Sequence, residues 1–169
     1  MSSSFSLIGR DLVTDRLILR PWPPDEVSAV SDGNRFPHWA EDFPAEGDQD
    51  IAAAMAKHVT WLGEFGHRQM IERDSGRVTG SLGLFWPPIN GTVEIGYGVV
   101  ASRRGRGYAP EAARALTAFA FTAPEVTMVY ARVEPGNTSS IRVLEKAGFQ
   151  KSMTEIEGNI LRYHAVPPA

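Results

Sequence analysis

Hydrophobic residues recur along the chain at two different spacings, and the switches between these spacings predict the order of the secondary-structure elements. Residues 16–22 place Leu17 and Leu19 on one side and end near a proline, which predicts a strand. By contrast, Ile51 and Met55 begin a run at spacings of three and four, which predicts a helix. The same criteria predict strands at 16–22, 67–73, 77–86, 92–100, 127–133, 149–156 and 160–166, and helices at 23–32, 48–64, 110–122 and 138–148.

The turns and connections between these segments indicate a mixed sheet. Asp74, Ser75 and Gly76 lie between two alternating segments and are typical of the turn of an antiparallel hairpin. The strand, helix and strand between residues 92 and 133 require parallel neighbours joined by a right-handed crossover. We therefore predict an α/β (α+β) fold with a mostly antiparallel sheet around one central parallel β-α-β unit.

Length and composition limit the domain organisation and the class of partner. The chain of 169 residues is the size of one domain, so we expect residues 1–11 to form a loose lead-in and residues 12–169 a single domain. Lysine and arginine total 17 against 20 acidic residues, which argues against nucleic acid or a membrane as partner. There is no cysteine, the four histidines are widely spaced, and no apolar stretch approaches ~18 residues. We expect a soluble cytoplasmic protein without a metal site.

The segment RRGRGYAP (103–110) combines three arginines, two glycines and a proline directly before a predicted helix. A helix N-terminus carries unpaired N–H groups and about half a positive charge, so it attracts anions. Gly105 and Gly107 permit close approach of the backbone, and Pro110 fits a first turn, where its missing N–H is not needed. The segment therefore predicts a site for a pyrophosphate or polyphosphate. A polar turn that only leads into a helix is the alternative.

The same segment resembles the acyl-CoA pyrophosphate loop of the GNAT superfamily of N-acyltransferases. The pattern of that loop is Arg or Gln, two residues, Gly, one residue, and Gly or Ala. A dinucleotide-binding loop instead needs a third glycine where Pro110 stands. The residues that match the GNAT pattern are Arg104, Gly105, Arg106, Gly107, Tyr108 and Ala109.

A second motif and two further segments extend the resemblance. The segment EPGNTSSIRVLEKAGF (134–149) is similar to the second signature of the superfamily. The residues that match it are Asn137, Ser140, Leu144, Gly148 and Phe149. LVTDRLILRPW and EIGYGVV resemble the subgroup that contains the ribosomal-protein N-terminal acetyltransferases. The resemblance spans about residues 12–165 and implies the GNAT fold, a twisted sheet of six to seven strands with helices on both faces.

This resemblance implies acetyl-CoA as co-substrate. In the superfamily, the pantetheine arm pairs with exposed backbone where the strand EIGYGVV separates from the next parallel strand, and a backbone N–H near Val99 would polarise the thioester carbonyl. Asn137 would bond the pantetheine arm, and a role as helix N-cap is its alternative. The residues expected to bind the coenzyme are Gly98, Val99, Val100, Arg104, Gly105, Arg106, Gly107, Tyr108, Ala109, Asn137 and Ser140.

Direct transfer of an acetyl group to an amine, in a ternary complex, requires a base for the amine and a proton donor for the leaving thiolate. Strand alternation puts Glu94 on the side of two glycines, and it is the expected base; a salt-bridge partner is the alternative. Many relatives use a tyrosine just after the family leucine, but Glu145 follows Leu144 here. Ser140 is therefore the expected proton donor, with helix packing as its alternative.

The acceptor amine is predicted only as a class. In the superfamily, it enters beside the loop between the first two helices and the final hairpin; packing in a satellite of the core is the alternative for side chains there. The expected acceptor-binding residues are Phe36, His38, Trp39, Glu41 and Trp86. An α-amino group with a pKa near ~8 is ~10% neutral at pH 7, and a lysine amine under ~0.1%. This favours peptide N-termini, or small-molecule amines of low pKa such as those of antibiotics.

The sequence also bears on the assembly of the protein and on alternatives to an enzymatic function. Relatives often pair through the last hairpin, so the resemblance implies a possible homodimer. A non-catalytic acyl-CoA-binding sensor domain is the alternative to an enzyme. A nucleic-acid binder is a third class, which the acidic total charge disfavours.

Overall fold

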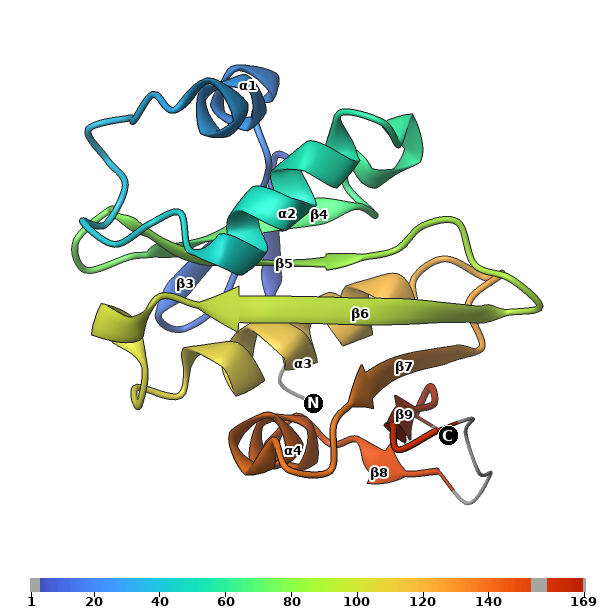
Figure 1. The fold of residues 1–169 in the computed structure, drawn as a ribbon. Helices are drawn as coiled ribbons and strands as arrows, with labels where there is room; N and C mark the ends of the chain where they lie inside the picture. The colour runs from blue at the N-terminus through green and yellow to red at the C-terminus, as the bar shows by residue number, and fades with distance from the viewer. Residues whose placement is uncertain (1–3, 153–157, 169) are drawn as a thin grey trace.

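A central sheet organises the fold (Figure 1), and the computed structural model describes residues 4–152 and 158–168. In chain order the strands are β1 (Ser6–Ile8), β2 (Asp11–Val13), β3 (Leu17–Pro21), β4 (His67–Glu72), β5 (Val78–Leu84), β6 (Thr92–Val99), β7 (Met128–Val133), β8 (Gln150–Lys151) and β9 (Leu161–Ala165). The helices are α1 (Pro24–Asp32), α2 (Glu46–Met55), α3 (Tyr108–Ala120) and α4 (Thr138–Lys146), with 3-10 turns at Val59–Trp61 and Ala101–Arg103.

The nine described strands form one sheet in the order β1-β2-β3-β4-β5-β6-β7-β9-β8. β6 and β7 pair in parallel, and the other neighbours pair antiparallel. The predicted mostly antiparallel sheet with one parallel unit is therefore confirmed, but it has more strands than six to seven. The additional strands β1 and β2 have three residues each, too few for an alternation to stand out. β1 also lies within residues 1–11, which were predicted to be a loose lead-in.

Side chains that alternate along the strands separate the core into two layers. Leu17 and Leu19 of β3 belong to the larger cluster, which α3 covers, whereas Ile18 packs against the cluster that α1 and α2 cover. Leu116 and Phe119 are part of the contribution of α3 to the larger cluster. Helices therefore cover both faces of the sheet, as predicted, and Figure 1 shows α2 and α3 on opposite sides of β6.

The parallel pair β6 and β7 separates after three residue pairs. The pairing runs from Thr92 and Met128 to Glu94 and Tyr130. Beyond Glu94, β6 continues to Val99 beside β5, while β7 diverges from it (Figure 1). One edge of β6 is thus left without a neighbouring strand inside the sheet. Unpaired strand edges present N–H and C=O groups that an extended ligand can bond.

Two helix boundaries and one turn differ from the prediction. α2 spans residues 46–55 rather than 48–64, because the backbone of His58 leaves the helical region with φ of −124° and a 3-10 turn follows. α3 begins at Tyr108, so Pro110 occupies its third position, where N–H groups still have no intrahelical partner. β8 and β9 pair as the predicted last hairpin, whose turn lies partly outside the described residues.

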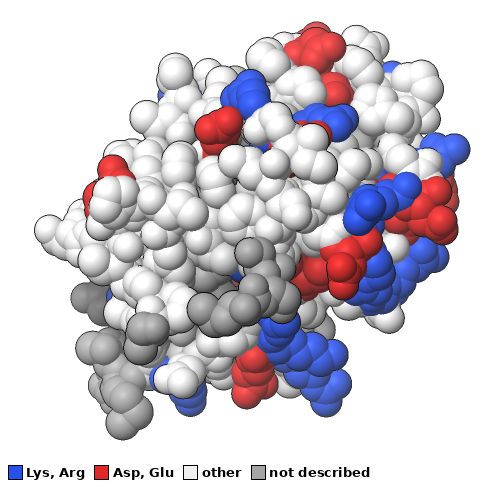
Figure 2. All heavy atoms as spheres, turned by 180° about the vertical axis from the view of Figure 1, so that it is seen from behind, with Lys and Arg blue, Asp and Glu red and all other residues white. Residues whose placement is uncertain are grey.

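Charged residues of both signs are interspersed on one face of the molecule. On the face seen from behind, blue and red residues lie next to one another rather than in separate areas (Figure 2). None of the described helices has the length and apolar character needed to cross a bilayer.

Candidate active site

A cleft of about 860 Å³ lies where β6 and β7 separate. The loop between β6 and α3, the end of β6, and parts of α4 and α2 line it. Ile95 belongs to the core layer under α3 and Val100 to the layer under α2. By alternation, Gly96 and Gly98 therefore face α2, whereas Tyr97 faces α3 and α4. The cleft thus reaches both faces of the sheet past the free edge of β6.

The backbone at the end of β6 offers hydrogen-bonding groups to this cleft. The N–H of Val100 donates to the carbonyl of Thr79 at 2.9 Å, so the backbone N–H of Val100 points toward β5. Because these groups alternate along a strand, the N–H and C=O of Val99 point the other way, toward the free edge. Nε of Arg104 donates to the carbonyl of Val99 at 3.1 Å on that edge. A main-chain N–H is thus presented at the position where the resemblance implies the polarising donor.

Two glycines in the left-handed backbone region shape the loop before α3. Gly105 and Gly107 each have φ of 79°, a conformation that strains other residues, and Gly107 is the N-cap of α3. Gly107, Tyr108 and Ala109 line the cleft. The N–H groups of a first helical turn have no intrahelical partner, so they remain available to an anion in the cleft.

Arg16, in the turn between β2 and β3, braces this loop from behind. Its guanidinium donates to Glu111 at 2.8 Å and to the carbonyl of Arg106. Thr14 donates its hydroxyl to Glu111 at 2.6 Å. Burial raises the pKa of Glu111, but the hydrogen bonds from Thr14 and Arg16 outweigh burial and hold the pKa below its usual value. An ionised carboxylate of α3 therefore helps to fix the loop at neutral pH.

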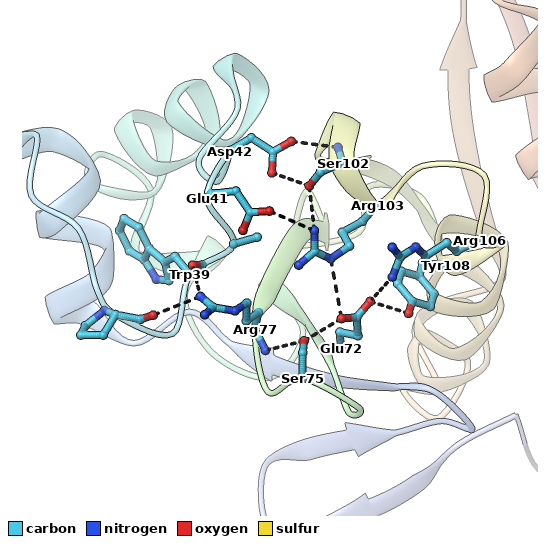
Figure 3. A network of polar contacts seen from close by, with 12 residues as sticks. Trp39, Glu41, Asp42, Glu72, Ser75, Arg77, Ser102, Arg103, Arg106 and Tyr108 are labelled. Carbon is cyan, nitrogen blue, oxygen red and sulfur yellow. Dashed lines mark hydrogen bonds and ion pairs between the residues drawn. The ribbon is translucent and has the colours of Figure 1, made fainter.

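Arg106 of the loop and Tyr108, the first residue of α3, meet the buried carboxylate of Glu72 on β4 (Figure 3). Glu72 accepts hydrogen bonds from Nη1 of Arg106 at 2.9 Å and from the hydroxyl of Tyr108 at 2.6 Å. Nε of Arg103 lies 3.6 Å from the same carboxylate. The side chain of Arg106 is therefore committed to Glu72, and Arg106 does not line the cleft. The structure does not support its predicted contact with the coenzyme.

Of the residues predicted to bind the coenzyme, Arg104 lies at the cleft, whereas Val100 is buried in the core. Arg104 lines the cleft, and its guanidinium lies at the carbonyl of Val99. Val100 is 1% exposed and packs in the core layer under α1 and α2. Its N–H is bonded to β5, so the structure does not support a contact between Val100 and pantetheine.

Asn137 and Ser140 lie at the first turn of α4, and both line the cleft. The side-chain oxygen of Asn137 accepts a hydrogen bond from the N–H of Ser140 at 3.1 Å, so Asn137 is the N-cap of α4. The hydroxyls of Ser140 and Tyr97 lie 2.7 Å apart. Burial raises the pKa of Tyr97, and the contact with Ser140 offsets this only in part. A protonated pair of hydroxyls thus faces the cleft from the side of α4.

Glu94 lies outside the cleft. Its carboxylate forms an ion pair with Arg132 of β7 through two hydrogen bonds, from Nε at 2.8 Å and from Nη2 at 3.2 Å. Glu94 belongs to the stretch where β6 and β7 are still paired, before the cleft opens. The structure therefore does not support Glu94 as the base, and the salt-bridge alternative describes its contacts.

Three of the predicted acceptor residues instead pack around Glu26 of α1. Nε1 of Trp39 donates to Glu26 at 2.6 Å, and Nε2 of His38 lies 2.9 Å from the same oxygen. The ring of Phe36 packs on Trp39 with 5.6 Å between centroids. None of the three lines the cleft. The core alternative therefore describes them, because the loop folds back onto α1.

Glu41 and Trp86 also lie outside the lining of the cleft. Glu41 is exposed, and one of its oxygens lies 3.5 Å from Nη1 of Arg103. Trp86 stacks on Phe65 with 4.7 Å between ring centroids, beside the larger core cluster. The prediction that these residues bind the acceptor is therefore not supported.

Three polar residues on the α2 side of the cleft were not found from the sequence. Asp48 of α2 accepts hydrogen bonds from the N–H of Ala45 at 2.9 Å and from the hydroxyl of Ser81. Burial raises the pKa of Asp48, and these hydrogen bonds offset the rise only in part. His67 of β4 is 1% exposed, and burial lowers its pKa to about 4. The three residues come from separate elements, so no local motif joins them.

The family described as Acetyltransferase (GNAT) domain matches residues 16–150, a span that contains both the glycine loop and α4. The chain belongs to this GNAT acetyltransferase family. One relative, the "Uncharacterized N-acetyltransferase p20" of Bacillus licheniformis, is 28% identical over 146 residues, which cover 83% of this chain and 82% of that protein.

Solved structures share the GNAT fold with this chain. A putative ribosomal-protein-serine acetyltransferase from Vibrio cholerae has a TM-score of 0.64 at 20% identity and covers 93% of this chain and 97% of its own. AAC(6')-Ib in complex with paromomycin and acetyl-CoA has a TM-score of 0.61 at 20% identity, over 90% of this chain and 94% of its own. The resemblance inferred from the sequence is thus confirmed. In the described part of the chain, no group of three or more His, Cys, Asp or Glu is arranged to hold a metal ion.

Proposed function

We propose that this protein transfers an acetyl group from acetyl-CoA directly to a primary amine within a ternary complex. The observation that carries the proposal is one continuous cleft from the left-handed glycine loop before α3 to the free edge of β6. This cleft suits a ligand with a diphosphate at one end and an amide-bearing arm at the other. A structural neighbour solved with acetyl-CoA supports the choice of ligand.

The residues that would hold the coenzyme form a path along the cleft. The backbone N–H groups of the glycine loop and of the first turn of α3 would bind the diphosphate, and the guanidinium of Arg104 would add charge to it. Asn137 would bond the pantetheine arm at the other wall. Arg142 and Lys146 are exposed on α4 and line the cleft, where they would attract the remaining phosphate of CoA.

The thioester of acetyl-CoA would lie at the free edge of β6, beside Val99. The N–H of Val99 would donate to the carbonyl oxygen and stabilise the negative charge that develops there, an effect worth about 3 kcal/mol for one such donor. Ser140, paired with Tyr97, would give its hydroxyl proton to the departing thiolate. Because the donor at Val99 is main chain, no side-chain substitution removes it.

Release of free thiol tests this proposal. The protein is mixed with acetyl-CoA and a panel of primary amines, and thiol is measured over time, with CoA binding measured separately by calorimetry. We expect thiol only when both acetyl-CoA and an amine are present. CoA binding without turnover on any amine would favour the non-catalytic sensor domain. No CoA binding would contradict both functions.

The acceptor class is open between small molecules and peptide N-termini. One structural neighbour is described as a ribosomal-protein-serine acetyltransferase, and another was solved with paromomycin. Both descriptions are compatible with a primary amine as acceptor. A homodimer and a cytoplasmic location stay predictions from the sequence.

A further inference from the structure

A buried carboxylate stands on the wall of the cleft opposite the hydroxyl pair. Asp48 is 4% exposed and lines the cleft from α2, whereas Tyr97 and Ser140 line it from the other face of the sheet. The hydroxyl of Ser81 donates to Oδ1 of Asp48, and the N–H of Ala45 donates to Oδ2. These two hydrogen bonds fix the orientation of the carboxylate.

The register of the sheet brings this carboxylate to the predicted position of the thioester. Ser81 of β5 is paired directly with Gly98 of β6, and neighbouring strands lie ~4.8 Å apart. Gly98 precedes Val99, whose N–H points to the free edge of β6. A Cβ atom built on Gly98 would meet no other atom within 4 Å, so the space above Gly98 is open. An amine that lies over Gly98 is therefore next to the Ser81 and Asp48 pair.

His67 gives a second, independent sign of a ligand on this wall. It lines the same cleft, is 1% exposed, and its Nε2 has no hydrogen-bond partner among the described residues. Its ring lies over Gly83, where an added Cβ would be 2.1 Å from Nδ1. Burial keeps the imidazole neutral, so its polar atoms offer hydrogen bonds without charge. A buried polar group without a partner costs stability unless a ligand satisfies it.

Among the residues that the structure describes, no cation forms an ion pair with the Asp48 carboxylate. Its hydrogen-bond partners are a hydroxyl and a main-chain N–H. Of the charged groups on neighbouring elements, Arg103 contacts Glu72 and Glu41, and Glu26 of α1 bonds Trp39, His38 and Gln69. On α2 itself, Glu46 and Asp50 are exposed. The negative charge of Asp48 is therefore left for a ligand.

We propose that Asp48 binds the ammonium group of the acceptor and takes its proton, and that the acceptor is a primary amine with a single positive charge. The inference rests on the proposed acetyl transfer. Among the described residues that line the cleft, Asp48 is the carboxylate, while Arg103, Arg104, Arg142 and Lys146 are cations. Glu41 and Asp42 lie outside this lining, and they contact Arg103 and Ser102. A polycation would lack partners here and would meet like charges.

Acetyl transfer to the amine involves two proton losses from nitrogen, one new C–N bond and one broken C–S bond. One ammonium proton passes to the carboxylate of Asp48 and then to solvent, and the freed lone pair forms the C–N bond to the acetyl carbon. The C–S bond breaks, and its electron pair stays on sulfur. The thiolate takes the hydroxyl proton of Ser140, and the second proton lost by nitrogen restores that hydroxyl. The products are the acetylated amine, CoA with a free thiol, and one proton.

Asp48→Asn tests the inference, with Asp50→Asn on the exposed side of the same helix as matched control. Asparagine keeps the shape, an acceptor for the N–H of Ala45 and a donor for Ser81, so the fold and the CoA dissociation constant are expected to be retained. With a panel of primary monoamines, including propylamine and an alanine-initiated tripeptide amide, we expect kcat/KM to fall at least ~100-fold in Asp48→Asn. The loss shrinks as the pH approaches the pKa of the amine, because the free amine then needs no base. Asp50→Asn matches the parent.

A second variant separates chemistry from folding. Ser81→Ala leaves the carboxylate in place but removes a hydrogen bond that lowers the pKa of Asp48. We expect the acidic limb of the kcat/KM profile to move to higher pH, which a purely structural defect would not produce. Asp48→Asn with the kcat/KM of the parent, an unmoved limb in Ser81→Ala, or faster turnover of spermidine than of every monoamine would overturn the inference. Absence of turnover by the parent on any amine, with CoA bound, would overturn the proposed function itself.

Discussion

The hydroxyl of Tyr97 on β6 lies 2.7 Å from the hydroxyl of Ser140 on α4. This contact joins the strand that would hold the thioester to the helix whose first turn would hold the pantetheine arm. Both residues line the cleft, and the phenol of Tyr97 stays protonated because burial raises its pKa. The pair is therefore suited to deliver a proton to a leaving thiolate, although α4 carries no tyrosine.

Removal of this pair is expected to slow the chemical step. Ser140→Ala should lower kcat ~10- to 100-fold, and Tyr97→Phe should lower it less, because Ser140 remains as donor. The double variant should be no slower than Ser140→Ala, since the two hydroxyls act as one unit. Steady-state kinetics with saturating acetyl-CoA measures this, and Tyr130→Phe on β7 is the control. Additive losses would mean that the hydroxyls act separately.

Substitutions of Arg104 and Arg106 in the loop are expected to differ in their effect on the affinity for CoA. Arg104→Gln should raise the dissociation constant of CoA ~10-fold, because this guanidinium lines the cleft. Arg106→Gln should change it by less than ~3-fold, because that side chain bonds Glu72 and is half exposed. Calorimetric titration compares the variants. Equal effects of both substitutions would contradict the separate roles.

Glu94→Gln is expected to leave the pH profile of kcat/KM where it is in the parent protein. The substitution breaks the partly exposed ion pair with Arg132, which should lower the free energy of unfolding by no more than ~1 kcal/mol. Profiles between pH 5 and 9 and a urea titration check both statements. A profile that loses its acidic limb in this variant would return Glu94 to the role of base.

Glu72 is expected to support the loop most strongly at neutral pH. Burial raises its pKa, but hydrogen bonds from Ser75 and Tyr108 and the charges of Arg103 and Arg106 outweigh burial and hold the pKa below its usual value. A depressed pKa stabilises the fold above the unfolded value near ~4.3, and this contribution is lost as the pH falls further. Glu72→Gln should therefore be less stable than the parent by ~2 kcal/mol at pH 7. The difference in the free energy of unfolding between Glu72→Gln and the parent, measured by urea titration, should narrow below about pH 4. A difference that stays constant with pH would contradict this account of the network.

Features set by neighbouring residues in the chain were the ones that the sequence predicted well. The glycine loop with Gly105 and Gly107, the parallel unit around α3, and the N-cap that was the alternative for Asn137 each depend on a short segment. Contacts across the sheet were predicted poorly, because a strand register cannot be inferred from alternation alone. Alternation placed Glu94 on the side of Gly96 and Gly98, yet only the structure showed its ion pair with Arg132, which lies two residues beyond its register partner Tyr130.

The residues on the α2 side of the cleft, where the acceptor would bind, could not be predicted from local sequence either. Asp48 looked like an ordinary residue at the start of a helix, and Ser81 like one small residue of a buried strand. Their contact depends on how α2 lies on the sheet, which no local pattern encodes. Aromatic residues such as Trp39 and Trp86 drew attention by their size, but large apolar side chains more often fill a core than line a site.

A crystal structure of the complex with acetyl-CoA tests the central claim most directly. The predicted result is a diphosphate bonded to the N–H groups of residues 105–109, with the thioester carbonyl oxygen ~2.9 Å from the N–H nitrogen of Val99. A coenzyme bound outside the cleft, or a thioester directed away from the free edge of β6, would contradict the account.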